Sequence, residues 1–493
     1  MANLPHYNML IRGGTVIDGT KAPRFDAEVG INAGRIMAIG DLAGHTADQV
    51  IDARGLIVAP GFIDSHTHDD QAVLSRADMS FKVSQGVTTV IAGNCGISAA
   101  PLKRDMELPM PLNLLDTPPE KRFTSFAAYL AALRKTPSTV NIAAMVGHST
   151  LRVVTMASLD REATPDEIRA MQALVEEALQ AGAIGLSTGT FYPPAVKATT
   201  EEIIEVGRPL TAHKALYVTH MRDEADKVMD ALEETFRIGR ELGIPVVVSH
   251  HKVQNKPNFG KSAVTLPFIR ETMKHQCVSL DCYPYTAGST MIRTDRGMLE
   301  GRVLIASSAP HPECAGRDLD DIAKEWGLSK DDAARRLQPG SAIYFLMDEN
   351  DVQRILAFDE TMIGSDGIPV GESPHPRLWG TFPRVLGHYS RDVGLFPLET
   401  AVWKMTGLTA RNFGLQGRST LKVGHHADVV VFDAAAIRDA ATYETPTRPA
   451  EGITAVIVNG VVAWRNGAHS GARSGQVITR TPSNSVSTVK EPS

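Results

Sequence analysis

The alternation of helix and strand that decides the fold class is clearest in residues 164–187, TPDEIRAMQALVEEALQAGAIGLS. Thr164 can cap a helix, Pro165 suits its first turn, and Glu167 completes a capping box. Apolar residues then recur at helical spacing until Gly182, a residue type that commonly ends helices. A short apolar run typical of a strand follows directly. The stretch therefore predicts one unit of a parallel βα sheet or barrel.

The same pattern recurs through the middle of the chain, from about residue 61 to residue 415. Short apolar runs alternate there with amphipathic helical segments. Eight runs are candidate strands: residues 61–68, 87–95, 141–148, 184–190, 216–221, 245–251, 278–285 and 361–366. Eight such strands predict an α/β fold with a (β/α)8 TIM-type barrel. The long segment 287–341, between the last two strands, is expected to be an inserted subdomain or lid.

The two ends of the chain have a different, β-like pattern. Residues 1–60 and 416–479 contain short apolar runs bounded by Gly and Asp, which are typical of strands. We therefore expect both ends to form one small β domain beside the barrel. Residues 480–493 are rich in Ser, Thr and Pro and are expected to be a disordered tail.

The composition argues against several classes of protein. The 493 residues are 43% hydrophobic and 22% charged, which are ordinary values for a globular chain. A net charge of −6, without long runs of one sign, gives no footprint for nucleic acid or an anionic membrane. Four cysteines do not make a disulfide framework, and no segment reads as a signal peptide or membrane span. We expect a cytoplasmic protein with a small-molecule substrate; its oligomeric state stays open, a monomer included.

Metal-binding side chains stand where predicted strands end, which is where TIM-type barrels carry their active sites. His66 and His68 alternate along the first strand, so both side chains point to one side. Cys95, His220 and His250 end three other strands. A thiolate and imidazoles are a suitable zinc shell. Each residue taken alone would more often be an ordinary core residue, but the shared position favours a metal site.

Two other histidines compete for this role. His148 also ends a predicted strand, and His251 directly follows His250. Strand alternation points His251 away from the face that His250 uses, so we rank it lower.

Asp366 ends the last predicted strand and is the candidate general base and acid. A metal lowers the pKa of a bound water to about 7, and a nearby carboxylate can take its proton and pass it to a leaving amine. In isolation the Asp366–Gly367 pair would indicate only a turn. The metal ligands on neighbouring strands favour the catalytic interpretation.

Six sequence blocks together resemble the D-aminoacylase, or N-acyl-D-amino-acid deacylase, family of the amidohydrolase superfamily. They are PGFIDSHTHDD (60–70), GNCGIS (93–98), GTFYPP (189–194), THMRDE (219–224), SHHK (249–252) and GSDG (364–367). The resemblance covers nearly the whole chain and implies a metal-hydrolase barrel with a β-sandwich made from both chain ends. It also implies zinc-dependent hydrolysis of N-acyl-D-amino acids to a carboxylate and a free D-amino acid.

The same resemblance implies roles for the metal-binding residues. Cys95, His220 and His250 would hold one tightly bound, catalytically sufficient zinc. His66 and His68, with Cys95 as a bridge, would form a second, weaker metal position. Many members of the superfamily bridge two metals with a carboxylated lysine. Because this chain has a cysteine instead, we do not expect a lysine carbamate.

An N-acyl amino acid carries a free α-carboxylate, which needs a cation and hydroxyl donors near the metal. Lys252 lies two positions beyond His250 and is therefore aimed to the same side. The resemblance implies that Tyr283, Ser289 and Arg377 share this carboxylate.

Other residues would set the choice of substrate. The resemblance implies that Tyr192 holds the scissile carbonyl. A pocket containing Phe191 and Met298 should favour apolar side chains such as D-methionine or D-leucine. Arg293 or Arg296 in the insert could instead receive an acidic side chain, so N-acyl-D-glutamate or N-acyl-D-aspartate is an alternative.

Two further alternatives stay open. A cyclic-amide hydrolase resembling dihydropyrimidinase could use the same barrel, because fold alone does not choose the substrate. A non-catalytic scaffold is less favoured, because the metal-binding residues and Asp366 are all present. The D-handedness rests on the resemblance alone.

Overall fold

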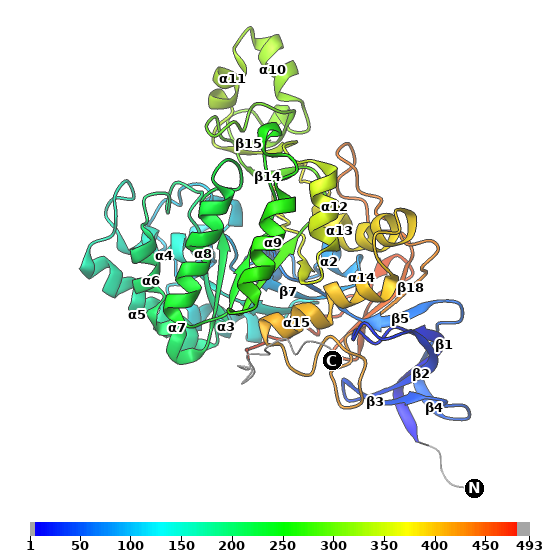
Figure 1. Ribbon diagram of the computed structural model, residues 1–493. Helices are drawn as coiled ribbons and strands as arrows, with labels where there is room; N and C mark the ends of the chain where they lie inside the picture. Colours follow the sequence, from blue (N-terminus) through cyan, green and yellow to red (C-terminus); the bar gives the residue numbers. More distant parts are fainter. Residues whose placement is uncertain (1–4, 481–493) are drawn as a thin grey trace.

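The computed structural model describes residues 5–480, and parallel strands form its centre (Figure 1). These strands are β6 (Phe62–Asp64), β7 (Val87–Ala92), β8 (Asn141–Ala144), β9 (Val146–Gly147), β10 (Gly185–Gly189), β11 (Leu216–His220), β12 (Val246–Val248), β13 (Val278–Cys282) and β17 (Thr361–Ile363). The first three pair in the order β6-β7-β8, and the others in the order β9-β10-β11-β12-β13-β17. Only Met145 separates β8 from β9, and its N–H bonds to Ala92 at the end of β7.

The series of strands returns to its start. The N–H of Ser65, directly after β6, donates to the carbonyl of Ile363 in β17 with an N···O distance of 3.3 Å. Thr67 and Gly367 form a parallel bridge between the same two segments. Each of the eight predicted strands overlaps an observed one, the third being the interrupted pair β8 and β9. The α/β class is thereby confirmed.

Helices separate these strands along the chain, as the apolar periodicity predicts. The longest, α5 (Pro165–Ala181), begins with the predicted capping box between Thr164 and Glu167 and ends at Gly182, whose φ is +119°. The others are α1 (Ala72–Ser75), α2 (Ser80–Val83), α3 (Phe126–Lys135), α4 (His148–Thr155), α6 (Thr200–Val206), α7 (Arg208–His213), α8 (Val228–Leu242), α9 (Ser262–Met273), α12 (Glu349–Ala357), α13 (Arg377–Arg384), α14 (Leu398–Met405) and α15 (Gly407–Phe413). Shorter 3₁₀ turns are η1 (Leu112–Leu115), η2 (Pro119–Lys121) and η3 (Lys256–Asn258), and η5 (Val385–Asp392) is a π-helix.

The part of the chain between β13 and α12 is folded and projects from the rest of the molecule (Figure 1). It contains an antiparallel sheet of β14 (Gly288–Met291), β16 (Gly340–Tyr344) and β15 (Val303–Ser308), followed along the chain from β15 by η4 (Pro312–Cys314), α10 (Leu319–Trp326) and α11 (Lys330–Arg336). The predicted boundary at residue 341 falls inside β16, because pairing with both neighbours extends that strand to Tyr344.

Both chain ends contribute to one nine-stranded sheet. Its strands are β1 (His6–Val16), β2 (Phe25–Asn32), β3 (Arg35–Gly40), β4 (Thr46–Asp52), β5 (Ile57–Pro60), β18 (Val429–Phe432), β19 (Ile453–Val458), β20 (Val461–Arg465) and β21 (Ala468–His469). The two ends join where β5 pairs antiparallel with β18, so that Val58 lies opposite Val431. The predicted tail lies outside the described residues except for Arg480. Within residues 5–480, no helix has the length and apolar character needed to cross a membrane.

Candidate active site

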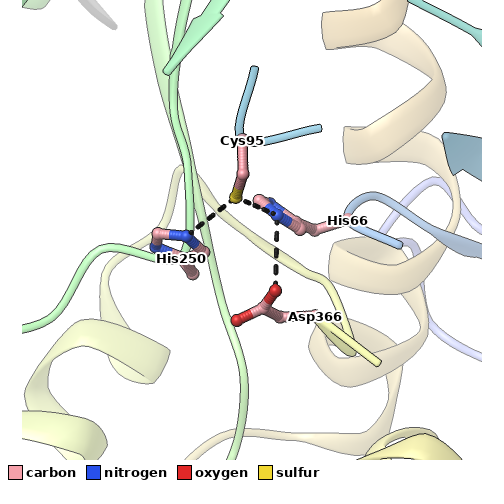
Figure 2. A group of neighbouring side chains, drawn as sticks. All are labelled: His66, Cys95, His250 and Asp366. Atoms are coloured by element: carbon pink, nitrogen blue, oxygen red, sulfur yellow. Dashed lines mark hydrogen bonds and ion pairs between the residues drawn. The ribbon is translucent and has the colours of Figure 1, made fainter. Parts of the chain in front are cut away.

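Four of the predicted side chains meet at the carboxyl ends of the parallel strands (Figure 2). Cys95 Sγ lies 3.2 Å from His66 Nε2 and 3.4 Å from His250 Nε2. Asp366 Oδ1 lies 3.6 Å from His66 Nε2. All four residues are buried. The shared strand-end position that the sequence predicted therefore brings these potential ligands together.

The two remaining predicted metal ligands lie at the edge of this group. His220 Nδ1 is 3.6 Å from Cys95 Sγ, and His68 Nε2 is 3.2 Å from Asp366 Oδ1. His220 and His250 thus approach the sulfur from different strands, each with one ring nitrogen. All six side chains converge on Cys95 and Asp366.

Three of these residues have an unusual backbone. Cys95, His250 and Asp366 have φ values of +54°, +34° and +49°, in the left-handed region that side chains other than Gly rarely adopt. Such conformations cost about 1–3 kcal/mol each and cluster at functional sites. The three residues follow the ends of β7, β12 and β17, and their side chains lie in one cluster (Figure 2). Sequence patterns carry no signal for this feature.

The charges around Cys95 favour its ionised form. Burial by itself raises the pKa of the thiol, but His66 and His250 beside it hold the pKa well below its ordinary value. A thiolate with imidazole nitrogens around it is the donor set that divalent zinc or a similar borderline metal prefers. The ring nitrogens that face Cys95 or Asp366 are His66 Nε2, His68 Nε2, His220 Nδ1 and His250 Nε2. The residues present therefore fit a metal centre.

Asp366 contacts a cation that the sequence analysis assigned to the substrate. Arg377 Nη2 lies 2.9 Å from Asp366 Oδ2 and also donates to the carbonyl of Ser289 at 3.1 Å. Burial raises the pKa of Asp366, but Arg377 and His250 more than offset this and hold it well below its ordinary value. The carboxylate is therefore ionised, as a general base requires.

The predicted substrate residues surround one small cavity beside this cluster. Its lining includes the predicted residues Phe191, Tyr192, Lys252, Tyr283, Ser289, Met298 and Asp366. The free volume is about 30 Å³, which is small beside the roughly 300–1,000 Å³ of typical ligand pockets. Arg377 does not line the cavity but lies with its guanidinium 4.5 Å from the ring centre of Tyr283. Lys252 Nζ is 5.6 Å from the same ring centre, so two cations flank this tyrosine.

The two competing histidines have other partners. His148 Nε2 lies 3.1 Å from Glu202, and His251 Nε2 lies 2.9 Å from Thr265 Oγ1. Neither is among the clustered potential metal ligands found in residues 5–480. The strand-alternation argument against His251 agrees with this geometry.

Sequence reasoning missed two buried carboxylates behind the histidines. Asp281 Oδ1 lies 3.4 Å from His66 Nδ1 and accepts the backbone N–H of His250 at 2.8 Å. Glu224 contacts both His250 and Lys252. Glu224 ends the quoted block THMRDE, four residues after His220, and this proximity was the one available signal.

A series of parallel strands with a buried thiolate, histidines and carboxylate at its carboxyl end is typical of metal-dependent hydrolases. The amidohydrolase family model matches residues 49–275 and 329–463. The chain belongs to the amidohydrolase family and is a hydrolase.

Individual relatives match almost the whole chain. It is 61% identical over 475 residues to a D-aminoacylase of Alcaligenes xylosoxydans xylosoxydans, covering 96% of this chain and 98% of the relative. A solved D-aminoacylase structure matches with a TM-score of 0.94 at 60% identity. That D-aminoacylase is described as having a binuclear metal centre, with one-metal activation and second-metal attenuation. That match covers 96% of this chain and 100% of the other.

A second solved structure is an N-acyl-D-glutamate deacylase of Bordetella bronchiseptica with zinc and a phosphonate inhibitor that mimics the tetrahedral intermediate. It matches with a TM-score of 0.93 at 45% identity, covering 96% of this chain and all of that one. These comparisons bear out the family resemblance read from the sequence and a metal centre in the relatives.

Proposed function

We propose that this protein is a zinc-dependent N-acyl-D-amino-acid deacylase that prefers apolar side chains. The observation that carries the proposal is the meeting of Cys95, His220, His250 and Asp366 beside a cavity lined by Lys252. The names of the relatives support the same class of substrate.

Cys95, His220 and His250 would hold the tight zinc, and His66 and His68 with Cys95 a weaker second one. When bound, zinc supplies a Lewis acid that polarises the amide carbonyl and makes water acidic enough to react near neutral pH. The relative with one-metal activation supports a single sufficient metal.

Asp366 is the proposed proton carrier. Its ionised carboxylate accepts a proton from the attacking water and donates that proton to the departing amine nitrogen, so the residue ends each cycle as it began. Arg377, 2.9 Å away, keeps Asp366 ionised before attack. The contact between them also gives Arg377 a part in setting the position of the base.

Lys252 and Arg377 are the proposed clamp for the substrate's α-carboxylate, together with the hydroxyl groups of Tyr283 and Ser289. The cationic groups of Lys252 and Arg377 lie near the ring of Tyr283. Lys252 and Ser289 also line the cavity. Charge-assisted hydrogen bonds would hold the substrate's α-carboxylate beside the metal. The neighbouring amide of the substrate would then lie near Asp366. The clamp supports linear N-acyl amino acids over cyclic amides.

Tyr192 is proposed to donate to the scissile carbonyl. Its hydroxyl oxygen accepts a hydrogen bond from Thr290 Oγ1 at 3.1 Å, which leaves its own proton free to donate. Burial, followed by the nearby charge of Cys95, raises the pKa of Tyr192 well above its ordinary value. The residue therefore remains a donor at neutral pH.

Phe191 and Met298 support an apolar side chain in the substrate. Arg293 is already engaged, because it donates to Asp295 at 2.7 Å and to the carbonyl of Phe191 at 2.8 Å. Arg296 also donates to a carbonyl, that of Arg222 at 2.7 Å, but it is 30% exposed and lies 4.9 Å from the Phe191 ring centre. That exposure favours N-acyl-D-glutamate as the second candidate substrate, in line with the relative that acts on it.

The domain assignment is part of the proposal. We interpret residues 61–415 as a (β/α)8 barrel, residues 1–60 and 416–479 as a β-sandwich, and residues 287–341 as a lid on the barrel. The lid interpretation is supported by Ser289 and Met298 of the insert, which line the cavity. A cytoplasmic location also stays a prediction.

Hydrolysis of racemic N-acetylmethionine by the zinc-loaded protein tests the proposal, with the released amino acid resolved on a chiral column. Free D-methionine alone is the expected result. Release of L-methionine would contradict the handedness, and release only from N-acetyl-D-glutamate would favour the acidic substrate. No hydrolysis of either compound would contradict the proposed substrate class, and hydrolysis of a cyclic amide instead would favour that alternative.

A further inference from the structure

Glu224 lies behind the two histidines that the proposed tight metal position uses. Its Oε1 is 3.1 Å from His250 Nδ1, and its Oε2 is 3.5 Å from His220 Nε2. Lys252 Nζ donates to Oε1 at 2.7 Å, and Gln254 Nε2 donates to Oε2 at 3.2 Å. The carboxylate is buried, with 2% of its surface exposed.

In each histidine, Glu224 faces the nitrogen that Cys95 does not. His250 presents Nε2 to Cys95 Sγ, and Figure 2 shows its other ring nitrogen turned away from the sulfur. His220 presents Nδ1 to the same sulfur and Nε2 to Glu224. A single carboxylate therefore spans the rear of both rings.

The chemistry of the imidazole ring decides which group donates and which accepts where Glu224 meets the histidines. A neutral imidazole that binds a metal through one nitrogen carries its proton on the other, and that proton needs an acceptor. Two groups contact His250 Nδ1, namely Lys252 Nζ at 2.7 Å and Glu224 Oε1. The ammonium has no lone pair, so only the carboxylate can accept.

A buried cation, Lys252, compensates the negative charge of Glu224. The ammonium Nζ of Lys252 lies 2.7 Å from Oε1 of the carboxylate, and both side chains are buried. Lys252 is anchored in turn by the carbonyl oxygen of His250 at 3.0 Å. An ionised acceptor is thus available behind both rings.

We propose that Glu224 is a positioning residue that fixes the orientation and tautomer of His220 and His250 for the metal. The inference rests on the proposed function only in placing the tight metal at Cys95 and these two histidines. Substituting such an outer carboxylate typically weakens metal binding by about 10- to 100-fold.

The test compares zinc affinity, measured by competition with a chelator, between the unmodified protein and Glu224→Gln. We expect zinc binding to weaken by about 10- to 100-fold. Cobalt loaded in place of zinc should give an altered visible absorption spectrum, which reports ligand geometry and which a general loss of stability would not move. Glu224→Asp keeps the charge and should recover part of the affinity.

The matched control is Glu202→Gln, because Glu202 is also buried and contacts a histidine and a cation away from the metal cluster. It should leave zinc affinity and the cobalt spectrum unchanged. If Glu224→Gln folds poorly because Lys252 loses its partner, Glu224→Gln combined with Lys252→Met removes both charges together. The double variant should show the same loss of zinc.

If the unmodified protein binds zinc tightly and the Glu224 variants show unchanged zinc affinity and cobalt spectrum, the inference about Glu224 is overturned. The proposed function is not affected by that result. An equal loss in Glu202→Gln would also overturn the inference about Glu224, because the effect would then be general. Absence of tight zinc from the unmodified protein would contradict the metal assignment in the proposed function. If the zinc results are as expected but the protein hydrolyses no substrate, the proposed function is contradicted and the role of Glu224 stands.

Discussion

Glu224 and Glu202 make similar contacts in two different regions of the molecule. Glu224 pairs with His250 and Lys252, and Glu202 pairs with His148 and Arg152. Both carboxylates are buried, with 2% and 3% of their surface exposed. The two regions therefore share a histidine, a carboxylate and a cation.

The difference lies in what the other side of each histidine faces. His250 turns Nε2 toward Cys95, whereas His148 Nδ1 is buried without a hydrogen-bond partner among the described residues. Arg152 is itself tied to backbone, donating to the carbonyls of Pro194 and Arg161 at 2.7 Å each. A buried histidine and carboxylate thus form a candidate site only where a second set of ligands converges on the ring.

Changing Asp366 should have the largest effect and should be confined to the metal region. Asp366→Asn keeps the shape of the side chain but removes the base, so kcat should fall about 10²- to 10⁴-fold. Zinc content, measured on the same sample, should stay at the unmodified level, because Cys95, His220 and His250 are untouched. Near-normal kcat with full zinc would contradict the assigned role.

Glu202→Gln should act on stability instead. Loss of charge-assisted hydrogen bonds to His148 and Arg152 should lower the free energy of unfolding by about 1.5–3 kcal/mol. Urea unfolding measures this change. If kcat per folded molecule also fell sharply, the distinction between the two regions would fail.

The free energy of unfolding should depend on pH through Glu202 in this region. Burial raises the pKa of Glu202, but His148 and Arg152 offset this, so it falls from 4.5 to about 2. A lowered pKa stabilises the folded state above pH 4.5, and this contribution is lost as the pH falls toward 2. Urea unfolding between these pH values should show a weaker pH dependence in Glu202→Gln; an unchanged slope would count against the ion pair.

Lys252→Met tests whether the cation beside Glu224 also serves the substrate. Loss of one charge-assisted contact should raise KM for N-acetyl-D-methionine by about 10- to 100-fold. N-acetyl-D-methioninamide, which lacks the carboxylate, should show a smaller loss, namely the part that comes from leaving Glu224 without its cation. An equal loss on both compounds would indicate a structural role only.

Met298→Leu should have the smallest effect. Exchanging these side chains of similar volume usually costs less than about 1.5 kcal/mol, so the ratio of kcat/KM for D-methionine and D-leucine derivatives should move by less than about tenfold. Met37→Leu, at a residue that is 49% exposed, is the control and should leave the ratio unchanged. A change in activity on N-acetyl-D-glutamate would not fit this pocket.

Much of the candidate site could be predicted because strands impose a simple geometry. Parallel strands place their carboxyl ends at one edge, so Cys95, His220 and His250 could be grouped although they are far apart in the sequence. The link between Arg377 and Asp366 was not predicted, because Arg377 begins a helix after a loop of irregular conformation. Asp281 was missed for another reason, since it lies inside the predicted strand 278–285, whereas the argument considered polar residues at strand ends.

The fold class, the strand order along the chain and the set of residues able to bind a metal could be predicted from the sequence. Periodicity and residue chemistry are local properties, so they can be read without coordinates. The tertiary structure was needed to show which histidine faces the thiolate and which faces Glu202, because that depends on contacts between segments far apart in sequence. It also set the left-handed backbone of Cys95, His250 and Asp366, which the surrounding packing holds in place.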